Sequence, residues 1–346
     1  MTPHRRLVRM LVACISGLVV LAAVPAAAST EPAFIAIKGI EYAPRVGNAH
    51  VLDLYLPTNA RGPVPVVVWS AGSAWLGDNG NQGGEVLAQR FTPHGFAVAA
   101  VAVRSSSQAT FPAQVHDGKA AVRWLRAHAR RYHLDPGRFA AMGNSSGGWL
   151  ASMLGVTGGV ASLEGDLGPR GWSSRVQAVI DLYGPTDFLQ MDEHMLPGGC
   201  AIINLISGGT DCHNDPLSPE SRLVGCPIQA CPGEVARANP ATYASRDDPP
   251  FRILHGTADL LVPHHQSEVL FQALHRACVE VGFTSLEGRG HEHGYLDETA
   301  PPFTPHSTLA SRGCGPVHTF TGPPVTWDAL ASQLTRTLAG QDRHAA

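Results

Sequence analysis

The chain has 346 residues, of which 44% are hydrophobic and 15% are charged, and its formal net charge is −3. This composition supplies enough apolar residues for a large buried core and excludes an intrinsically disordered chain. No basic stripe is present that would bind a nucleic-acid backbone, so we expect no nucleic-acid partner.

The first 28 residues have the pattern of a secretory signal peptide. A start with three arginines precedes a continuous apolar segment at residues 10–24, and three alanines at 26–28 provide small residues for cleavage. The apolar segment is short for a membrane span, and no second apolar run of about 20 residues follows it. We therefore expect a secreted protein without a stable membrane span, in which residues 29–346 form a single domain. A retained N-terminal anchor is the alternative.

Strands and helices are predicted to alternate along the rest of the chain. Predicted strands cover residues 34–40, 50–56, 64–70, 96–104, 138–142, 176–182, 251–255 and, as the last strand, 284–286; predicted helices cover 83–91, 112–132, 146–154, 265–281 and 325–338. The runs VPVVVWS and FAVAAVAVR are nearly unbroken apolar segments, typical of strands buried on both faces of a parallel sheet. The alternation predicts the α/β class, with a doubly wound, mostly parallel sheet flanked by helices.

Six cysteines remain once Cys14 of the signal segment is set aside, and an even number in an exported chain indicates disulfides. They are Cys200, Cys212, Cys226, Cys231, Cys278 and Cys314. Six cysteines allow 15 pairings; proximity in the sequence favours Cys200–Cys212, Cys226–Cys231 and Cys278–Cys314. The first four lie in a region rich in glycine and proline, inside an irregular segment at about 184–250. We expect this segment to form a cap-like insertion that shapes a substrate pocket.

The stretch AAMGNSSGGWL at residues 140–150 joins a predicted buried strand to a predicted helix. In that context Gly143-x-Ser145-x-Gly147 matches the G-x-S-x-G pattern of a nucleophilic serine on a sharp turn. The flanking glycines let the strand and helix approach closely, while the helix N-terminus offers N–H groups to a developing oxyanion. This register selects Ser145 over Ser146, whose backbone N–H is better placed as an oxyanion donor. The structural alternative is a helix cap formed by Ser145.

A serine nucleophile needs a base and an acid that orients the base. In the predicted fold both follow the serine along the chain, the acid (Asp) first and the base (His) second. Asp259 follows a predicted buried strand in FRILHGTADLLVP, and His291 lies in the glycine-flanked loop GRGHEHG. The runner-up acid is Asp187 and the runner-up base is His293. His255 lies at the end of the predicted strand that precedes Asp259, and it is expected to be structural. The His264-His265 pair and the His-Glu-His triplet at 291–293 suggest a metal, but no further ligand at helical spacing supports one. We expect no metal and no cofactor.

Six stretches of the sequence resemble the α/β-hydrolase superfamily, and within it the esterases of the hormone-sensitive-lipase and feruloyl-esterase-like (BD-FAE-like) groups. They are LDLYLP (52–57), VVVWSAGSAWLGD (66–78), the segment 111–151, LYGPTDF (182–188), ILHGTADLLVP (253–263) and GRGHEHG (288–294). The stretches occur in matching order over about residues 35–300. The resemblance implies an α/β-hydrolase fold and a Ser145–Asp259–His291 triad, and it is much less specific for the substrate.

The oxyanion loop departs from the family pattern. Those esterases usually carry His-Gly-Gly-Gly/Ala-Trp after the third strand, where this chain reads Ala-Gly-Ser-Ala-Trp at residues 71–75. Backbone donors do not require glycine, so the N–H groups of Ser73 and Ala74, together with that of Ser146, are the predicted oxyanion hole. Trp75 is expected to pack, and Asp117 to be an acid that supports its helix.

The sequence therefore predicts a secreted serine hydrolase that cleaves carboxylic esters through an acyl-enzyme, acting on small-molecule or polymer-linked esters. Two other hypotheses remain. One is a serine peptidase of the prolyl-oligopeptidase type, although such proteins usually carry a large N-terminal propeller. The other is a non-catalytic binding protein with this fold, for which the altered 71–75 loop is the only support.

Overall fold

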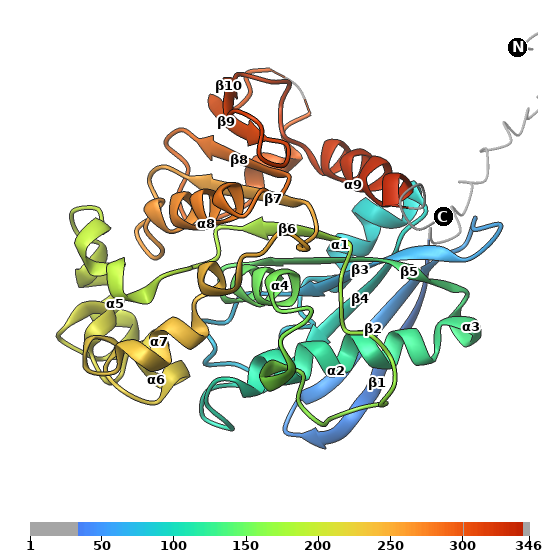
Figure 1. Cartoon of the computed structure of the whole chain (residues 1–346), viewed down its shortest axis with the longest axis horizontal. Coiled ribbons are helices and arrows are strands. Elements are labelled where there is room, and N and C mark those ends of the chain that lie inside the picture. Colours follow the sequence, from blue (N-terminus) through green and yellow to red (C-terminus); the bar gives the residue numbers. More distant parts are fainter. Residues whose placement is uncertain (1–33, 300, 342–346) are drawn as a thin grey trace, which may run out of the picture. The chain divides into compact units, whose positions relative to one another are not determined.

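The computed structural model describes residues 34–299 and 301–341, and the predicted signal peptide lies outside them. In this part of the chain, ten strands form one sheet in the order β1-β2-β4-β3-β5-β6-β7-β8-β9-β10 (Figure 1). They are β1 (Phe34–Val46), β2 (Ala49–Pro57), β3 (Val64–Ser70), β4 (Ala97–Ala102), β5 (Leu134–Asn144), β6 (Ala178–Leu182), β7 (Phe251–Gly256), β8 (Val281–Leu286), β9 (His306–Ser311) and β10 (His318–Phe320). Strands β4, β3, β5, β6, β7 and β8 pair in parallel, whereas β1, β2, β9 and β10 pair antiparallel. The predicted doubly wound, mostly parallel sheet is confirmed.

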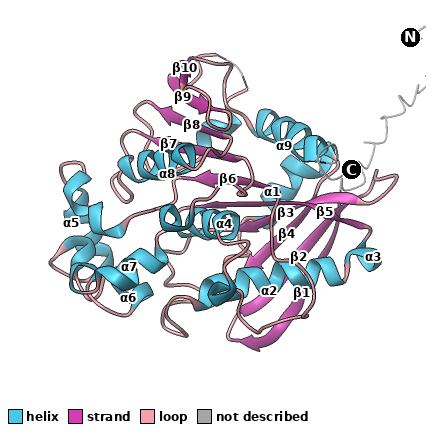
Figure 2. Cartoon of the chain, in the orientation of Figure 1, coloured by secondary structure: helices cyan, strands magenta, loops and turns pink. Residues whose placement is uncertain are grey.

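Helices cover both faces of this sheet (Figure 2). They are α1 (Gly84–Phe91), α2 (Ala113–Ala127), α3 (Ala129–Tyr132), α4 (Ser146–Val156), α5 (Gly199–Ser207), α6 (Pro219–Val224), α7 (Pro232–Ala238), α8 (His265–Arg276) and α9 (Trp327–Gln341). Val66 and Val68 of β3 point into the core shared with α2, α4 and α8, whereas Val67 and Trp69 point into the core shared with α1 and α9. This alternation explains why β3 and β4 are almost continuously apolar. No helix among the described residues has the length and apolar character to cross a lipid bilayer.

The register of the parallel strands brings several loops to one edge of the sheet. Ser70 at the end of β3 pairs with Gly143, Asn144 at the end of β5 pairs with Leu182, and Leu182 pairs with Leu254. The loops that follow β3, β5, β6, β7 and β8 therefore leave from adjacent carboxyl ends. In open parallel sheets this edge is where ligands bind.

Several predicted elements differ from the structure. The helix predicted over 112–132 is divided at His128 into α2 and α3, and the helix predicted over 265–281 ends at Arg276. Cys278 has a φ of 64°, which turns the chain so that Val281 begins β8. The prediction that 284–286 is the last strand is wrong, because β9 and β10 follow it. The sequence of β9, HSTLAS, is largely polar, and its Thr308 bonds to the hydroxyl of Thr284 on β8 at 2.7 Å.

The segment between β6 and β7 forms short helices, including α5, α6 and α7, and carries two disulfides. It packs against the loops at the carboxyl edge: Phe188 lies against Trp75 with ring centroids 5.6 Å apart, and Trp149 of α4 donates its indole N–H to the Ala238 carbonyl at 2.7 Å. The expected packing role of Trp75 agrees with its burial between these aromatic rings. Asp117 is buried on α2 and accepts from Arg104 at 2.7 Å.

The disulfides are Cys200–Cys212, Cys226–Cys231 and Cys278–Cys314, the three pairs that sequence proximity favours. Their sequence separations are 12, 5 and 36 residues respectively. A crosslink stabilises a fold mainly by restricting the unfolded chain, and more so for a longer loop. The third bridge, which joins the end of α8 to the turn after β9, therefore constrains the unfolded chain most.

Replacing Cys278 and Cys314 together by alanine is expected to lower the free energy of unfolding by about 4 kcal/mol, from the loop length alone. The matched control replaces Cys226 and Cys231, whose shorter loop corresponds to about 2 kcal/mol. Urea unfolding followed by tryptophan fluorescence measures both. An equal or larger loss in the control would contradict this ranking.

Candidate active site

Ser145 lies on the turn between β5 and α4, with a φ of 55° and a ψ of −129°, and a positive φ is one that non-glycine residues rarely adopt. Its backbone N–H donates to the Leu182 carbonyl at 2.9 Å, and its carbonyl accepts from Trp149 at 3.0 Å. The Ser145 side chain makes no capping hydrogen bond to α4. The backbone is thus anchored on both sides while the hydroxyl is not used as a helix cap.

The glycines around Ser145 are required by close packing. A Cβ on Gly147 would overlap the carbonyl oxygen of Ser70 at the end of β3, and one on Gly143 would lie 2.7 Å from the same atom. A Cβ on Gly72 would lie 2.6 Å from the Cβ of Ser145. The G-x-S-x-G spacing therefore permits the strand, the helix and the 71–75 loop to meet around one serine.

Asp259 and His291 are joined by a hydrogen bond of 2.8 Å between His291 Nδ1 and Asp259 Oδ2. Asp259 is completely buried, whereas His291 is partly exposed. The other carboxylate oxygen accepts from the backbone N–H groups of Leu261 at 2.8 Å and Val262 at 3.0 Å. A carboxylate only accepts, so Nδ1 of His291 carries the proton and Nε2 is left as the basic nitrogen.

His255 is a second histidine on the same carboxylate. Its Nε2 lies 3.2 Å from Asp259 Oδ2 and 3.0 Å from the Val262 carbonyl, both acceptors, so this nitrogen carries a proton. Its Nδ1 lies 2.7 Å from the Ser267 hydroxyl. Burial alone raises the pKa of Asp259, but the hydrogen bonds from His255 and His291 outweigh burial and hold that pKa well below its usual range. Burial lowers the pKa of His255, which favours the neutral ring.

A side-chain network connects the loops at this edge. Asn144, directly before Ser145, accepts from the Gly72 N–H at 3.0 Å and donates to the Tyr183 hydroxyl at 3.3 Å. The same hydroxyl lies 2.7 Å from Nδ1 of His293, and the Tyr183 ring lies 4.6 Å from the His291 ring between centroids. Burial raises the pKa of Tyr183 above its ordinary value, so the phenol stays protonated. Tyr183 thus bridges the serine turn and the histidine loop.

The sequence reasoning missed Asn144 and Tyr183 as parts of the site, and it assigned His255 only a structural role. Tyr183 directly follows a buried strand and His255 lies near the end of another, both at the edge of the sheet that carries Ser145. This position at a strand end was the feature of the sequence that could have indicated a role in the site. Their hydrogen bonds depend on side-chain directions at three strand ends, which no local pattern in the sequence encodes.

The predicted oxyanion donors have different surroundings. The N–H of Ser73 donates to the Ser146 hydroxyl at 2.9 Å, so this amide already has an acceptor. Ser146 is the first residue of α4, where a backbone N–H has no partner within the helix. Ala74 has a φ of 51°, which turns the loop just before Trp75. Of the three predicted donors, the amide of Ser73 is therefore already occupied in this conformation.

The runner-up residues have other partners. Asp187 caps a short 3₁₀ helix by accepting from Leu189 N–H at 3.2 Å, and it also accepts from Gln190 at 2.7 Å. His293 bonds to Tyr183, and burial lowers its pKa. Among the described residues, Asp187 and His293 form no hydrogen bond with each other, so they do not make an alternative acid–base pair.

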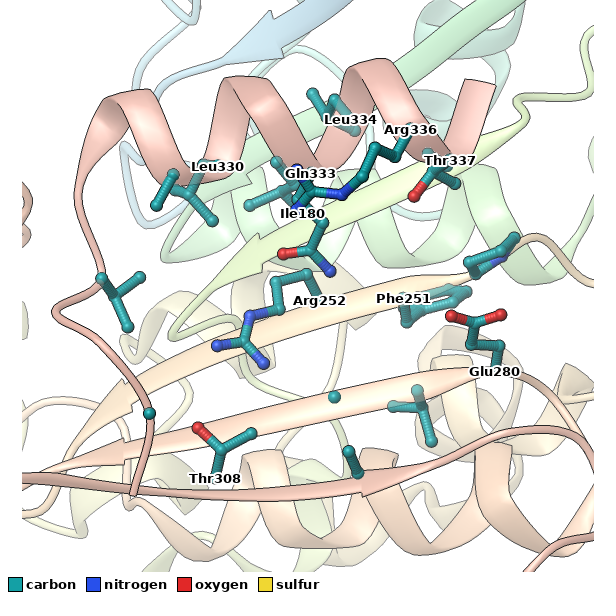
Figure 3. A pocket seen from close by; sticks show the side chains of 18 of the residues that line it. Ile180, Phe251, Arg252, Glu280, Thr308, Leu330, Gln333, Leu334, Arg336 and Thr337 are labelled. Atoms are coloured by element: carbon teal, nitrogen blue, oxygen red, sulfur yellow. The ribbon is translucent and has the colours of Figure 1, made fainter. Parts of the chain in front are cut away.

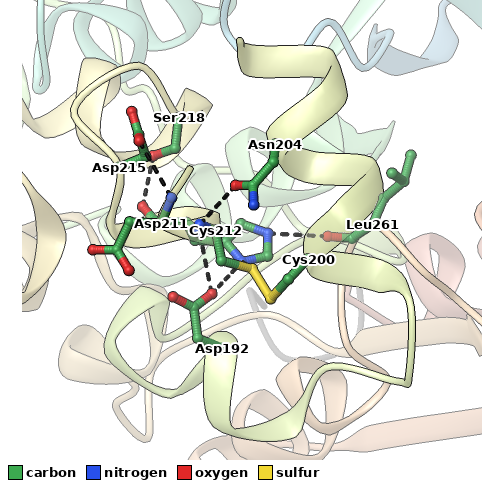
Figure 4. Close-up of a disulfide and its surroundings, with 9 residues drawn as sticks. Asp192, Cys200, Asn204, Asp211, Cys212, Asp215, Ser218 and Leu261 are labelled. Carbon is green, nitrogen blue, oxygen red and sulfur yellow. Dashed lines mark hydrogen bonds and ion pairs between the residues drawn. A yellow bond between two sulfur atoms is a disulfide. The ribbon is translucent and has the colours of Figure 1, made fainter. Parts of the chain in front are cut away.

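Within residues 34–299 and 301–341, the one group of three candidate metal ligands is Asp192, Cys212 and His213. Cys212 forms the disulfide to Cys200 (Figure 4). Nδ1 of His213 bonds to Asp192 at 2.6 Å. A disulfide sulfur is not a thiolate, so this group is better explained as the support of a crosslinked loop than as a metal site.

The sheet order and the serine on its strand–turn–helix define the α/β-hydrolase fold, which solved esterase structures share with this chain. Residues 52–274 match the BD-FAE family, and the chain belongs to that family. The resemblance predicted from the sequence motifs is confirmed.

The proteins that this chain is similar to include named esterases and solved esterase structures. Esterase LipC of Mycobacterium tuberculosis is 27% identical over 265 residues, covering 75% of this chain and 60% of the relative. A truncated carbohydrate esterase from gut microbiota superposes with a TM-score of 0.71 at 28% identity, covering 88% of this chain and 96% of that one. A bifunctional GH43-CE protein of Bacteroides eggerthii gives a TM-score of 0.69 at 32% identity, covering 88% of this chain and 35% of that one. The chain spans about half to three fifths of the length of the curated relatives it matches.

Proposed function

We propose that this protein hydrolyses carboxylic esters with Ser145 as nucleophile, His291 as general base and Asp259 as the acid that orients it. The observation that carries the proposal is the Asp259–His291 hydrogen bond, on a loop that Tyr183 links to the positive-φ turn of Ser145. Membership of the BD-FAE family and the esterase relatives support the same class of reaction.

In the proposed mechanism, Ser145 Oγ attacks the ester carbonyl carbon while Nε2 of His291 takes the hydroxyl proton. The negative charge of the tetrahedral intermediate forms next to the N-terminus of α4, where the Ser146 N–H and the helix dipole favour an anion. His291 then gives its proton to the leaving alcohol. Water activated by His291 hydrolyses the acyl-enzyme and restores Ser145. Asp259 stays ionised throughout, because its pKa is depressed.

The substrate class we propose is an ester carried on a carbohydrate, such as an acetyl or feruloyl group. Two of the similar solved structures, titled as a carbohydrate esterase and as a GH43-CE protein, support this choice. We also propose that the protein is exported with residues 1–28 as its signal peptide. Three disulfides support export, since such bonds persist in oxidising compartments.

Labelling with a fluorophosphonate tests the proposed function. The reagent is expected to form one adduct, located on Ser145 by peptide mass spectrometry. Ser146→Ala is the matched control, because it removes the neighbouring hydroxyl and keeps the backbone N–H. An adduct on Ser146 would assign the nucleophile to that residue instead. No labelling of folded protein would support the binding-protein alternative. Hydrolysis of peptides in preference to esters would support the peptidase alternative.

Tyr183→Phe is expected to lower kcat about tenfold, because it removes the hydroxyl that connects Asn144 to His293 and leaves the ring against His291. The measurement is steady-state hydrolysis of a short acyl chromogenic ester. Tyr243→Phe is the control, since that hydroxyl donates to the Arg237 carbonyl at 2.7 Å and touches neither catalytic loop. Equal kcat values for the two variants would refute a positioning role for Tyr183.

A further inference from the structure

A cavity of about 370 Å³ lies between α9 and the part of the sheet formed by β6 to β9 (Figure 3). Its apolar walls are Ile180, Phe251, Val325, Leu330 and Leu334. Its floor contains Gly282 and Ala310, which are paired neighbours on β8 and β9 and have almost no side chain. The triad residues do not line it, because they follow the carboxyl ends of their strands, whereas the cavity lies under α9 on one face of the sheet.

Arg252, the second residue of β7, reaches into this cavity below α9 (Figure 3). Its Nη2 donates to the Thr284 hydroxyl at 2.6 Å, and Thr284 bonds in turn to Thr308. Its Nε is buried and has no hydrogen-bond partner among the described residues. The guanidinium therefore keeps at least one donor for a ligand.

No acidic side chain in the described part of the chain forms an ion pair with Arg252. Glu280 is the acid that lines the cavity, and it precedes Thr284 by four residues along an extended strand, a distance of roughly 13 Å. Glu280 instead lies 3.9 Å from Arg312. Figure 3 places Glu280 beside Phe251, away from the guanidinium of Arg252.

The charged groups that face the cavity favour an anion. Arg252, Arg312 and Arg336 line it, against the single carboxylate of Glu280. Burial lowers the pKa of Arg252 to about 10, so it remains protonated at neutral pH. A desolvated cation without a partner is costly, and a carboxylate is the group that best matches the donor fork of arginine.

We propose that this cavity binds a small carboxylate with a short apolar chain. The carboxylate accepts from Arg252, and Gln333, which lines the cavity from α9, offers its amide nearby. The chain lies over Gly282 and Ala310 and packs against Leu330 and Leu334. The apolar walls select a carboxylate with a hydrocarbon chain over a bare inorganic anion, because burying that chain removes apolar surface from water.

Isothermal titration of the full chain with hexanoate tests the proposal. Arg252→Met is expected to weaken hexanoate binding at least tenfold, whereas Arg276→Met, which alters an exposed arginine at the end of α8, leaves it unchanged. Both variants keep the proposed ester-hydrolysing site, so any hexanoate bound there is common to them. Hexanamide, which has the same length without the charge, is expected to bind the unmodified protein at least tenfold more weakly than hexanoate.

Ala310→Leu provides a second variant that keeps Arg252 and fills the floor of the cavity. It is expected to weaken hexanoate binding and to abolish the rise in Tm that hexanoate gives the unmodified protein. If Arg252→Met does not fold, this variant decides the question. Unchanged hexanoate affinity in the folded variants, or equal binding of hexanamide, would overturn the proposal. The test is independent of Ser145 labelling, so its failure leaves the proposed function standing.

Discussion

Ser145→Ala is expected to lower kcat for a short acyl ester by roughly 10⁵- to 10⁶-fold, the loss that removal of a triad nucleophile typically causes. The variant keeps the glycine-flanked turn and the Asp259–His291 pair, because alanine differs from serine only by the hydroxyl. The remaining rate then comes from substrate binding and from the oxyanion donors alone. This loss is measured with a chromogenic acetate ester in stopped and continuous assays. The variant is purified in parallel with the unmodified chain.

The control for this prediction is Ser146→Ala, which alters the adjacent hydroxyl. It frees the Ser73 N–H that now donates to Ser146, and the expected change in kcat is less than about tenfold. A Ser145→Ala protein that keeps more than about one hundredth of the activity, well above the residual expected without a nucleophile, would be incompatible with nucleophilic catalysis by this residue.

Asp259→Asn is expected to lower kcat by about 10⁴-fold, as the same substitution does in other triads by stabilising the wrong histidine tautomer. The hydrogen-bond partners of Asp259 explain why an asparagine cannot replace it. One oxygen faces N–H donors from His255 and His291, and the other faces the amides of Leu261 and Val262. An asparagine NH₂ on either side therefore meets donors, which costs about 1–3 kcal/mol of stability as well.

The runner-up acid provides the matched control. Asp187→Asn keeps an oxygen that can accept from Leu189, so its kcat is expected to change by less than about threefold. Steady-state kinetics and thermal unfolding of both variants separate loss of catalysis from loss of folding. A larger loss of kcat in the Asp187 variant would transfer the role of the acid to that residue.

The pH dependence of the Asp259 contribution to stability has a defined sign. Because the folded-state pKa of Asp259 is depressed, its stabilising contribution is present above the unfolded-state pKa and is lost as the pH falls through the folded value. Neutral pH therefore lies inside the range in which the carboxylate supports both the fold and the orientation of His291.

Much of the fold followed from local patterns. The apolar runs of β3 and β4 are buried on both faces, and the turn at Gly143 to Gly147 matched a motif whose spacing reflects backbone contact with β3. The strand β9 was missed because its polar sequence is stabilised by pairing with β8. Helix α8 ended early because the chain turns at Cys278 before β8 begins.

The sequence by itself determined the strands up to β8, the helices that flank them, their order and the candidate triad, because hydrophobic period and glycine spacing are properties of neighbouring residues. Only the tertiary structure decided what surrounds the triad: the second histidine on Asp259, the bridge through Asn144 and Tyr183, and the acceptor that Ser146 offers to Ser73. The His255–Asp259 contact lies at a strand end, and the other contacts join residues 39 to 110 positions apart in the chain. Parallel register brings these residues together. The unpaired Arg252 was likewise invisible in the sequence, because its place under α9 and its separation from Glu280 follow from the packing of α9 and the register of β7 and β8.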